Sequence, residues 1–202
     1  MHKYTILFES HPNFNYFCKN FSDMRKLTTS ELNRLNVTDY HKVKKIPIII
    51  ILDNIRSMEN VGSFFRTADA FRIEAIYLCG ITACPPHREI HKTALGADES
   101  VDWKYFKTTS EACESLRVAG YRIFAVEQVE NSIMLDDFKA PKKSAYIFGN
   151  EVDGVDDSVL KFCEQAIEIP QKGTKHSLNV SVSGGIVMYH LFQNLSYIID
   201  IQ

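Results

Sequence analysis

The stretch from Ile169 to Gly185 has the residue types and spacing of a ligand-binding loop. Pro170 ends a short apolar run over residues 166–169, a polar basic loop follows, and Ser177 is predicted as the N-cap of a long apolar helix. A strand that leads through a loop to a helix N-terminus presents backbone N–H groups without partners, so it can bind a small polar or anionic ligand. The same pattern also fits an ordinary strand-to-helix connection.

Two earlier segments have the same order of apolar run, polar loop and helix. The run over residues 47–52 leads into Asn60-Val61-Gly62 and then Arg66, and the run over residues 144–148 leads into Gly149-Asn150-Glu151. The apolar positions between residues 60 and 71 recur at helical spacing, which predicts a helix, and Arg66 falls off that apolar stripe. By position alone, Arg66 also fits an ordinary solvent-exposed arginine.

These three segments need a scaffold that brings them together. The uninterrupted apolar run over residues 47–52 is typical of a strand buried on both faces, as in a parallel sheet. Strands are predicted over residues 47–52, 75–79, 101–106, 121–127, 144–148 and 166–169, and helices over residues 29–36, 60–71, 110–119 and 156–162, the third capped by Thr109. The alternation predicts an α/β fold, a parallel sheet flanked by helices, which binds ligands at the carboxyl ends of its strands.

The composition indicates one domain with a sizeable core, since 45% of its 202 residues are apolar. No apolar run approaches the roughly 18 residues of a membrane span, and no signal peptide is evident, so a cytoplasmic location is expected. The cysteines are odd in number and scattered, which favours reduced, buried thiols. They are Cys18, Cys79, Cys84, Cys113 and Cys163. The net charge of −2 argues against a protein that coats nucleic acid through its overall field, but it allows a local basic surface.

Several other ligand classes are disfavoured by their missing motifs. His87 and His91 stand four residues apart on a predicted helix, but Arg88 follows the first histidine and no third ligand is close, so no metal site is predicted. The acidic loop over residues 149–157 lacks the spaced ligands of a calcium loop. The sequence contains neither a dinucleotide-binding fingerprint nor a P-loop.

Taken together, the three segments resemble the signature motifs of the SpoU-TrmH family of RNA ribose 2′-O-methyltransferases, in the SPOUT class. The first motif is Asn60-Val61-Gly62 with Arg66-Thr67-Ala68, and the second is Gly149-Asn150-Glu151 with Gly154. The third is Ile169-Pro170 followed by Ser177-Leu178-Asn179-Val180-Ser181-Val182. The resemblance spans about residues 46–195, and three motifs in order are more specific than any one of them.

The resemblance implies S-adenosyl-L-methionine (AdoMet) as methyl donor, a C-terminal trefoil knot around the cofactor pocket, and a homodimer with its active site at the subunit interface. It implies tRNA or rRNA as substrate. Gly149, Ile169 and Leu178 match the positions that line the cofactor pocket. The polar catalytic set is matched by Asn60, Arg66, Glu151, Ser177 and Asn179.

The implied reaction is consistent with these residue types. A ribose hydroxyl is too weak an acid to attack at neutral pH without a nearby proton acceptor and an environment that favours the alkoxide. Because an arginine rarely loses its proton, Arg66 is expected to organise phosphate and hydroxyl more than to act as the base. Asn60, Ser177 and Asn179 would fix groups by hydrogen bonds, and Glu151 would anchor the second motif's turn or orient Arg66.

The chain departs from the family pattern at two places. Gly184 and Gly185 stand inside the predicted last helix, so a close backbone approach is expected there, as at a dimer contact. Residues 1–45 are too short for the separate RNA-binding domain of many relatives, so basic residues of the main domain would bind RNA, doubled by dimerisation. The candidates are Lys42, Lys44, Lys45, Arg56, Arg72, Lys142, Lys143, Lys172, Lys175 and His176.

The resulting domain prediction has three parts. Residues 1–23 form a loosely attached N-terminal extension, residues 24–45 a helix and linker, and residues 46–202 the methyltransferase domain. Two other function classes stay open. One is a catalytically inactive knotted RNA-binding protein, which the intact polar set disfavours. The other is a small-molecule hydrolase or mononucleotide-binding enzyme, for which the sequence offers no nucleophile elbow or phosphate loop.

Overall fold

The computed structural model describes residues 25–200. These residues divide into two compact units, one up to Asn36 and one from Val37 onward. The predicted extension over residues 1–23 lies outside the described residues. In the first unit, the helix predicted over residues 29–36 is wrong in length, because only a short 3-10 helix forms, η1 (Ser30–Leu32). Asn33 adopts a left-handed backbone conformation with φ 47°, which ends the helix.

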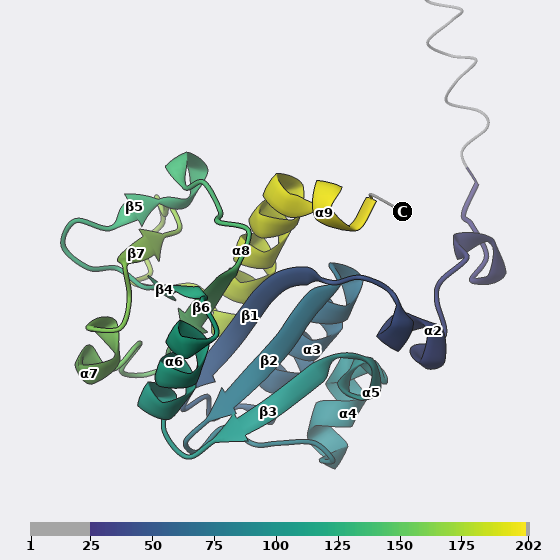
Figure 1. The fold of residues 1–202 in the computed structure, drawn as a ribbon, viewed down its shortest axis with the longest axis horizontal. Helices are drawn as coiled ribbons and strands as arrows, with labels where there is room; N and C mark the ends of the chain where they lie inside the picture. Colours follow the sequence, from purple (N-terminus) through teal and green to yellow (C-terminus); the bar gives the residue numbers. More distant parts are fainter. Residues whose placement is uncertain (1–24, 201–202) are drawn as a thin grey trace, which may run out of the picture. The chain divides into compact units, whose positions relative to one another are not determined.

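The second unit is built on one parallel sheet, as predicted. Its strands are β1 (Ile46–Asp53), β2 (Ile73–Cys79), β3 (Asp102–Phe106), β4 (Arg122–Val126), β5 (Ile133–Met134), β6 (Ser144–Phe148) and β7 (Gln165–Glu168). They lie in the order β3-β2-β1-β6-β4-β7-β5, and every neighbouring pair is parallel. The carboxyl ends of β4, β6 and β7 therefore meet at one edge of the sheet (Figure 1).

The helices of this unit connect the strands. They are α2 (Val37–Lys42), α3 (Met58–Ala70), α4 (Arg88–Ala94), α5 (Ala97–Ser100), α6 (Thr109–Val118), η2 (Leu135–Asp137), α7 (Asp157–Leu160), α8 (Val180–Leu195) and α9 (Tyr197–Asp200). Within residues 25–200 no helix is both long and apolar enough to cross a membrane.

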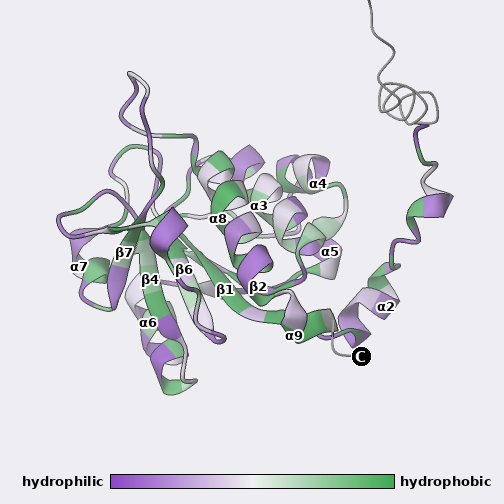
Figure 2. Ribbon diagram, turned by 90° about the horizontal axis from the view of Figure 1, so that it is seen from above, coloured by the Kyte–Doolittle hydropathy of each residue, from purple (hydrophilic) through white to green (hydrophobic). Residues whose placement is uncertain are grey.

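Two apolar layers hold the sheet between its helices. In β1, Ile48 and Ile50 face a layer shared with α3 and α8, whereas Ile49 and Ile51 face a layer shared with α6 and α7. The alternation follows from the two-residue period of a strand and explains why the whole run is apolar. Seen from above, the apolar central strands run between the α3 and α8 side and the α6 side (Figure 2).

Two local predictions need correction. Thr108, and not Thr109, caps α6: its hydroxyl accepts a hydrogen bond from the Glu111 backbone N–H at 3.2 Å. Thr109 is buried and donates its own hydrogen bond to Asp53. The close approach expected at the glycine pair occurs inside the chain for Gly184, which is buried in α8 against α3.

Candidate functional site

A cavity of about 720 Å³ opens at the carboxyl ends of β4, β6 and β7. Three loops line it, over residues 127–129, 149–155 and 169–179. Its volume is in the range of sites for small molecules and cofactors. The lining includes Gly149, Glu151, Ile169, Ser177, Leu178 and Asn179. Two of the three predicted segments thus line one cavity, whereas the first motif does not line it and residues 127–129 do.

The second loop is shaped by two glycines, Gly149 and Gly154. Gly149 lies so close to Gly154 that an added Cβ would stand 1.9 Å from the Gly154 carbonyl carbon. Gly154 has φ 72°, a conformation that glycine adopts without strain. Asn150 closes the loop, because its side-chain oxygen accepts the backbone N–H groups of Val152 and Asp153, each at 2.8 Å. These contacts hold the loop in a closed turn beside the cavity.

Glu127 supports this loop from the end of β4. Its carboxylate accepts hydrogen bonds from the backbone N–H of Val155 at 3.0 Å and of Gln128 at 2.8 Å, and it lines the cavity. Glu127 was not predicted as a site residue. A carboxylate directly after an apolar strand was the signal that could have identified it, because strand ends are where such sheets bind ligands.

Glu151 joins the second motif to the first. Its carboxylate accepts hydrogen bonds from the Asn60 amide at 2.9 Å and from the backbone N–H groups of Arg56 at 3.1 Å and Ser57 at 3.2 Å. Burial alone would raise the pKa of Glu151, but these hydrogen bonds outweigh burial and leave the pKa below its ordinary value. Glu151 is thus an ionised anchor at the start of α3, and it makes no contact with Arg66.

Asn60 is the centre of a network that also reaches the third motif. Its side-chain oxygen accepts a hydrogen bond from the Asn179 amide at 3.2 Å, and the Ser181 hydroxyl lies 3.2 Å away. Ser181 also lies 2.7 Å from the Asn179 side-chain oxygen, so its single proton can serve either acceptor. Ser181 was not predicted as a site residue, although it follows Asn179 by two positions in the same motif.

The predicted N-cap of the last helix is wrong by two residues. Asn179 caps α8, because its side-chain oxygen accepts the backbone N–H groups of Ser181 at 2.9 Å and Val182 at 3.3 Å. Ser177 instead lies in the exposed loop before the helix and lines the cavity. Both residue types are good caps, so the sequence alone did not distinguish them.

Arg66 is the one predicted site residue that lies apart from the others. It follows Asn60 by six residues on α3, which is about 9 Å along a helix axis. Its side chain is exposed, does not line the cavity, and makes no hydrogen bond or ion pair with any residue between 25 and 200. The cavity of a single chain therefore contains the predicted cofactor residues without the predicted arginine.

Several of the predicted RNA-binding side chains are already engaged. The Lys45 ammonium donates to the Tyr40 carbonyl oxygen and lies 3.1 Å from the centroid of the Tyr40 ring. Lys143 donates to the Ala119 carbonyl oxygen at 2.6 Å. By contrast, Lys172 and Lys175 are exposed in the loop that leads to Ser177, where they are available to an anionic ligand.

The two histidines make contacts within the fold, and the described thiols are free. His87 caps α4 through Nδ1, while His91 pairs with Asp98 at 3.1 Å, and the described residues hold no cluster of three or more side chains suited to a metal ion. Burial raises the pKa of both Cys79 and Cys113 to about 12. The four described cysteines are free, but the prediction that they are buried is wrong for Cys84 and Cys163, which are half-buried. Cys18 lies outside the described residues.

The fold and the site define a class of protein, namely a parallel α/β domain whose ligand cavity is built from loops at the carboxyl ends of its strands. The model of the SpoU rRNA Methylase family matches residues 47–189. The chain belongs to this family, as the three motifs predicted.

Individual methyltransferases are also similar to this chain in sequence. The chain is 30% identical over 142 residues to the 23S rRNA (guanosine-2′-O-)-methyltransferase RlmB of Neisseria meningitidis, which covers 70% of this chain and 56% of that protein. It is 29% identical over 164 residues to an uncharacterized tRNA/rRNA methyltransferase of Borreliella burgdorferi, covering 80% of this chain and 70% of that one. The chain thus spans little more than half the length of the Neisseria relative.

A solved structure shares the fold. The AdoMet-bound rRNA methyltransferase from Sinorhizobium meliloti superposes with a TM-score of 0.70 at 25% identity, over 75% of this chain and 58% of that one.

Proposed function

We propose that this chain is an AdoMet-dependent RNA methyltransferase that transfers a methyl group to a ribose 2′-hydroxyl of tRNA or rRNA. The observation that carries the proposal is the cavity of about 720 Å³ that joins Gly149, Ile169 and Leu178 to the hydrogen-bond network of Asn60 and Glu151. Membership of the SpoU rRNA Methylase family supports the same function.

The cavity lining fits AdoMet. Ile169 and Leu178 offer apolar surface for an adenine ring, and the carboxylates of Glu127 and Glu168 offer acceptors for hydroxyl and ammonium groups. Gly149, Ile169 and Leu178 would hold the cofactor, which supplies an electrophilic methyl group on a sulfonium. The chain's own residues then need to place the acceptor hydroxyl in line with that methyl group.

The hydrogen-bond network supports separate tasks for the polar residues. Glu151 is ionised and has three donors, so it holds the start of α3 against the cavity loop and does not take up the hydroxyl proton. Asn179 holds the start of α8 beside the same cavity. Ser177 is exposed at the rim, where it can donate to the ribose or its phosphate. These positions support a positioning mechanism without a covalent enzyme intermediate.

Arg66 would act from the other subunit of a homodimer. The exposed position of Arg66, outside its own chain's cavity, leaves it free to reach the cavity of a second copy. An exposed apolar stripe on α8 supports such an assembly: Val182, Ile186 and Tyr189 are 51%, 39% and 54% exposed. Apolar side chains exposed together at helical spacing are typical of an interface. In this assembly Arg66 organises the RNA phosphate and the 2′-hydroxyl.

The C-terminal trefoil knot implied by the family belongs to the same proposal. The strand order is compatible with it, since β6 lies between β1 and β4, and β7 lies between β4 and β5. The loops that line the cavity follow β4, β6 and β7. We place the methyltransferase domain at residues 46–202.

The proposal is tested by two measurements on the same preparation. Calorimetric titration with AdoMet should show binding without RNA, and labelled methyl groups should pass to tRNA or rRNA. Nucleoside mass spectrometry of RNA from cells with and without the gene then names the modified nucleotide. AdoMet binding and RNA binding without methyl transfer to any RNA would instead support the inactive RNA-binding protein. Absence of AdoMet binding would overturn the proposal.

A further inference from the structure

A second cavity, of about 490 Å³, lies beside the outer strand β3, whereas the proposed AdoMet cavity lies at the carboxyl ends of β4, β6 and β7. Its lining is Pro85, Pro86, His87, Arg88, His91, Asp98, Glu99 and Trp103. Trp103 belongs to the edge strand β3, four strands away from β4. At about 4.8 Å per strand the two sites of one chain are roughly 20 Å apart, so one small molecule cannot occupy both.

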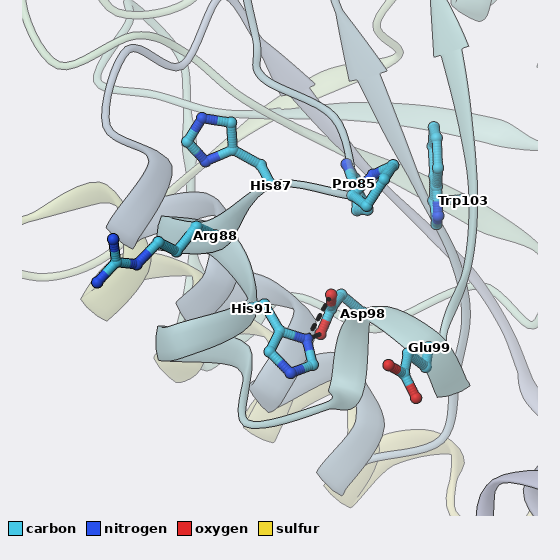
Figure 3. Close-up of a pocket in the computed structure, with 8 residues that line it drawn as sticks. Pro85, His87, Arg88, His91, Asp98, Glu99 and Trp103 are labelled. Atoms are coloured by element: carbon cyan, nitrogen blue, oxygen red, sulfur yellow. Dashed lines mark hydrogen bonds and ion pairs between the residues drawn. The ribbon is translucent and has the colours of Figure 1, made fainter.

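One wall of this cavity is apolar and flat. Trp103 is half-buried, and Figure 3 shows its ring nearly edge-on beside Pro85, with the indole nitrogen at the end nearest Asp98 and Glu99. An indole face and proline rings form the kind of surface on which an unpaired nucleobase packs.

The floor of the cavity carries hydrogen-bond acceptors. Asp98 is 9% exposed and is held by His91, whose Nδ1 lies 3.2 and 3.1 Å from the two carboxylate oxygens. Nδ1 must carry the proton in this pair, so in the neutral imidazole Nε2 remains as an acceptor. Glu99 is exposed, and its carboxylate makes no hydrogen bond or ion pair with other residues of the described part of the chain. It can therefore bind a ligand without breaking an existing contact.

The opposite end carries donors. In the view of Figure 3, Arg88 projects on the side away from Glu99. Its guanidinium is exposed and makes no hydrogen bond or ion pair within residues 25–200. Nδ1 of His87 accepts the backbone N–H of Glu89 at 3.2 Å, so Nε2 carries the proton and can donate. These donors suit a phosphate group, and the carboxylates at the other end suit the edge of a base.

This arrangement selects among the bases. A carboxylate accepts two parallel hydrogen bonds from the adjacent N1–H and N2–H groups of guanine. Adenine and cytosine present an acceptor nitrogen beside their amino group, and uracil presents a single N–H between two carbonyl oxygens, so a carboxylate is repelled at each of these edges.

We propose that this second cavity binds an unpaired guanosine of the RNA substrate, at a nucleotide other than the one methylated. The base lies against Trp103 and the prolines, its Watson–Crick edge meets Glu99, and its phosphate meets Arg88. The inference rests on the proposed function for the choice of RNA over a free nucleotide.

Trp103 supplies a direct readout, because it is the only tryptophan of the chain. The full-length protein is titrated with the single-stranded RNAs UUGUU and UUUUU, and with GMP, while tryptophan fluorescence is recorded. UUGUU should change the fluorescence with saturation, roughly tenfold or more tightly than UUUUU. GMP should bind more weakly than UUGUU, because it lacks the flanking phosphates.

The variant Glu99→Gln should lose the preference for UUGUU over UUUUU, because an amide cannot accept both guanine hydrogen bonds. The Glu99 carboxylate has no hydrogen bond or ion pair among residues 25–200, and His41 contacts only the Glu99 carbonyl oxygen, so the fold should be kept. Glu114→Gln, an equally exposed change on α6 on the other face of the sheet, is the matched control and should keep the preference.

Three results would overturn the inference: no fluorescence change with either RNA, equal affinity for UUGUU and UUUUU, or an unchanged preference in Glu99→Gln. Binding of GMP as tight as that of UUGUU would replace RNA by a free nucleotide and overturn it as well. AdoMet titration of the same samples separates the two proposals. Normal AdoMet binding with no guanosine preference rejects this cavity alone, and guanosine binding without AdoMet binding rejects the methyltransferase.

Discussion

Gly184 of α8 packs directly on Phe64 of α3: a Cβ added to this glycine would stand 2.2 Å from the Cε1 atom of the Phe64 ring. A Cβ added to the adjacent Gly185 would meet no other part of the protein within 4 Å. Phe64 is fully buried and also contacts Phe148 at the end of β6, with ring centroids 5.1 Å apart. It therefore has little room to yield. The two glycines of one helix thus have different reasons for being there.

Gly184→Ala should destabilise the protein by about 1–3 kcal/mol, because it forces extra volume into a packed contact. Gly185→Ala should not destabilise the single chain and should stabilise the helix by about 0.5–1 kcal/mol. Denaturant unfolding of both variants checks the pair, with monomeric samples used for the comparison. Equal effects of the two changes would contradict the packing described here.

Arg66→Ala should abolish methyl transfer while AdoMet binding persists, if Arg66 acts across the dimer. Mixing this variant with Leu178→Arg, which blocks the cavity, should restore about a quarter of the wild-type activity, since half of the randomly formed dimers contain one intact site out of two. Activity is measured after the two variants have been unfolded and refolded together. An inactive mixture that nevertheless forms mixed dimers would place Arg66 and its cavity in the same chain.

Glu151→Gln should weaken AdoMet binding by roughly five- to tenfold, because the amide keeps one acceptor oxygen and loses the charge that strengthens three hydrogen bonds. Folding lowers the pKa of Glu151, so its contribution is fully present above the carboxyl's ordinary pKa and is lost as the pH falls through the lowered value. AdoMet affinity measured against pH should therefore drop in acid for the wild type. The same drop in Glu151→Gln would assign it to another group.

Asn179→Ala should cost about 1 kcal/mol of stability through the lost N-cap of α8. Ser177→Ala, two residues earlier, should leave stability unchanged and reduce only methyl transfer, since Ser177 is exposed and caps no helix. Thermal unfolding and methyl-transfer rates on both variants test this division. A stability loss in Ser177→Ala equal to that in Asn179→Ala would show that the cap lies elsewhere.

Lys45 should make the stability depend on pH in the alkaline range. Burial is the main cause that lowers its pKa from 10.5 to about 8. Between these values the unfolded chain binds more protons than the folded chain, so this group's contribution to the free energy of unfolding rises with pH across that window. In Lys45→Met the rise should be smaller, whereas Lys44→Met, at an exposed neighbour, should follow the wild type. Identical slopes in all three proteins would contradict the assignment.

Much of the sheet could be predicted from the sequence because apolar runs such as residues 47–52 have one explanation, burial on both faces. The prediction of β6 agreed with the structure at both ends. The N-cap residues of helices could not be predicted in the same way. Thr108 and Thr109, or Ser177 and Asn179, are all good capping residues, and only the backbone conformation decides which side chain meets the free N–H groups.

The site was predicted as a set of residues but not as a network. The motifs predicted that Gly149, Ile169 and Leu178 would share a cavity, and the structure places them in one. They did not predict that Glu151 would bind the start of α3 instead of Arg66, because a carboxylate can accept from any nearby donor and the donors here are backbone groups. Short polar residues at strand ends, such as Glu127, have no sequence period that marks them.

The Asn60 side chain has a consequence for how the protein assembles. Its partners Glu151, Asn179 and Ser181 are 91, 119 and 121 residues away along the chain. Closing loops of this length costs conformational entropy before any contact forms, and non-local contacts slow folding. On the ribosome, β1 and α3 emerge long before α8 does. The network is therefore completed only after residue 181 has been added, and a chain released before that residue carries the cavity walls without the network that joins them.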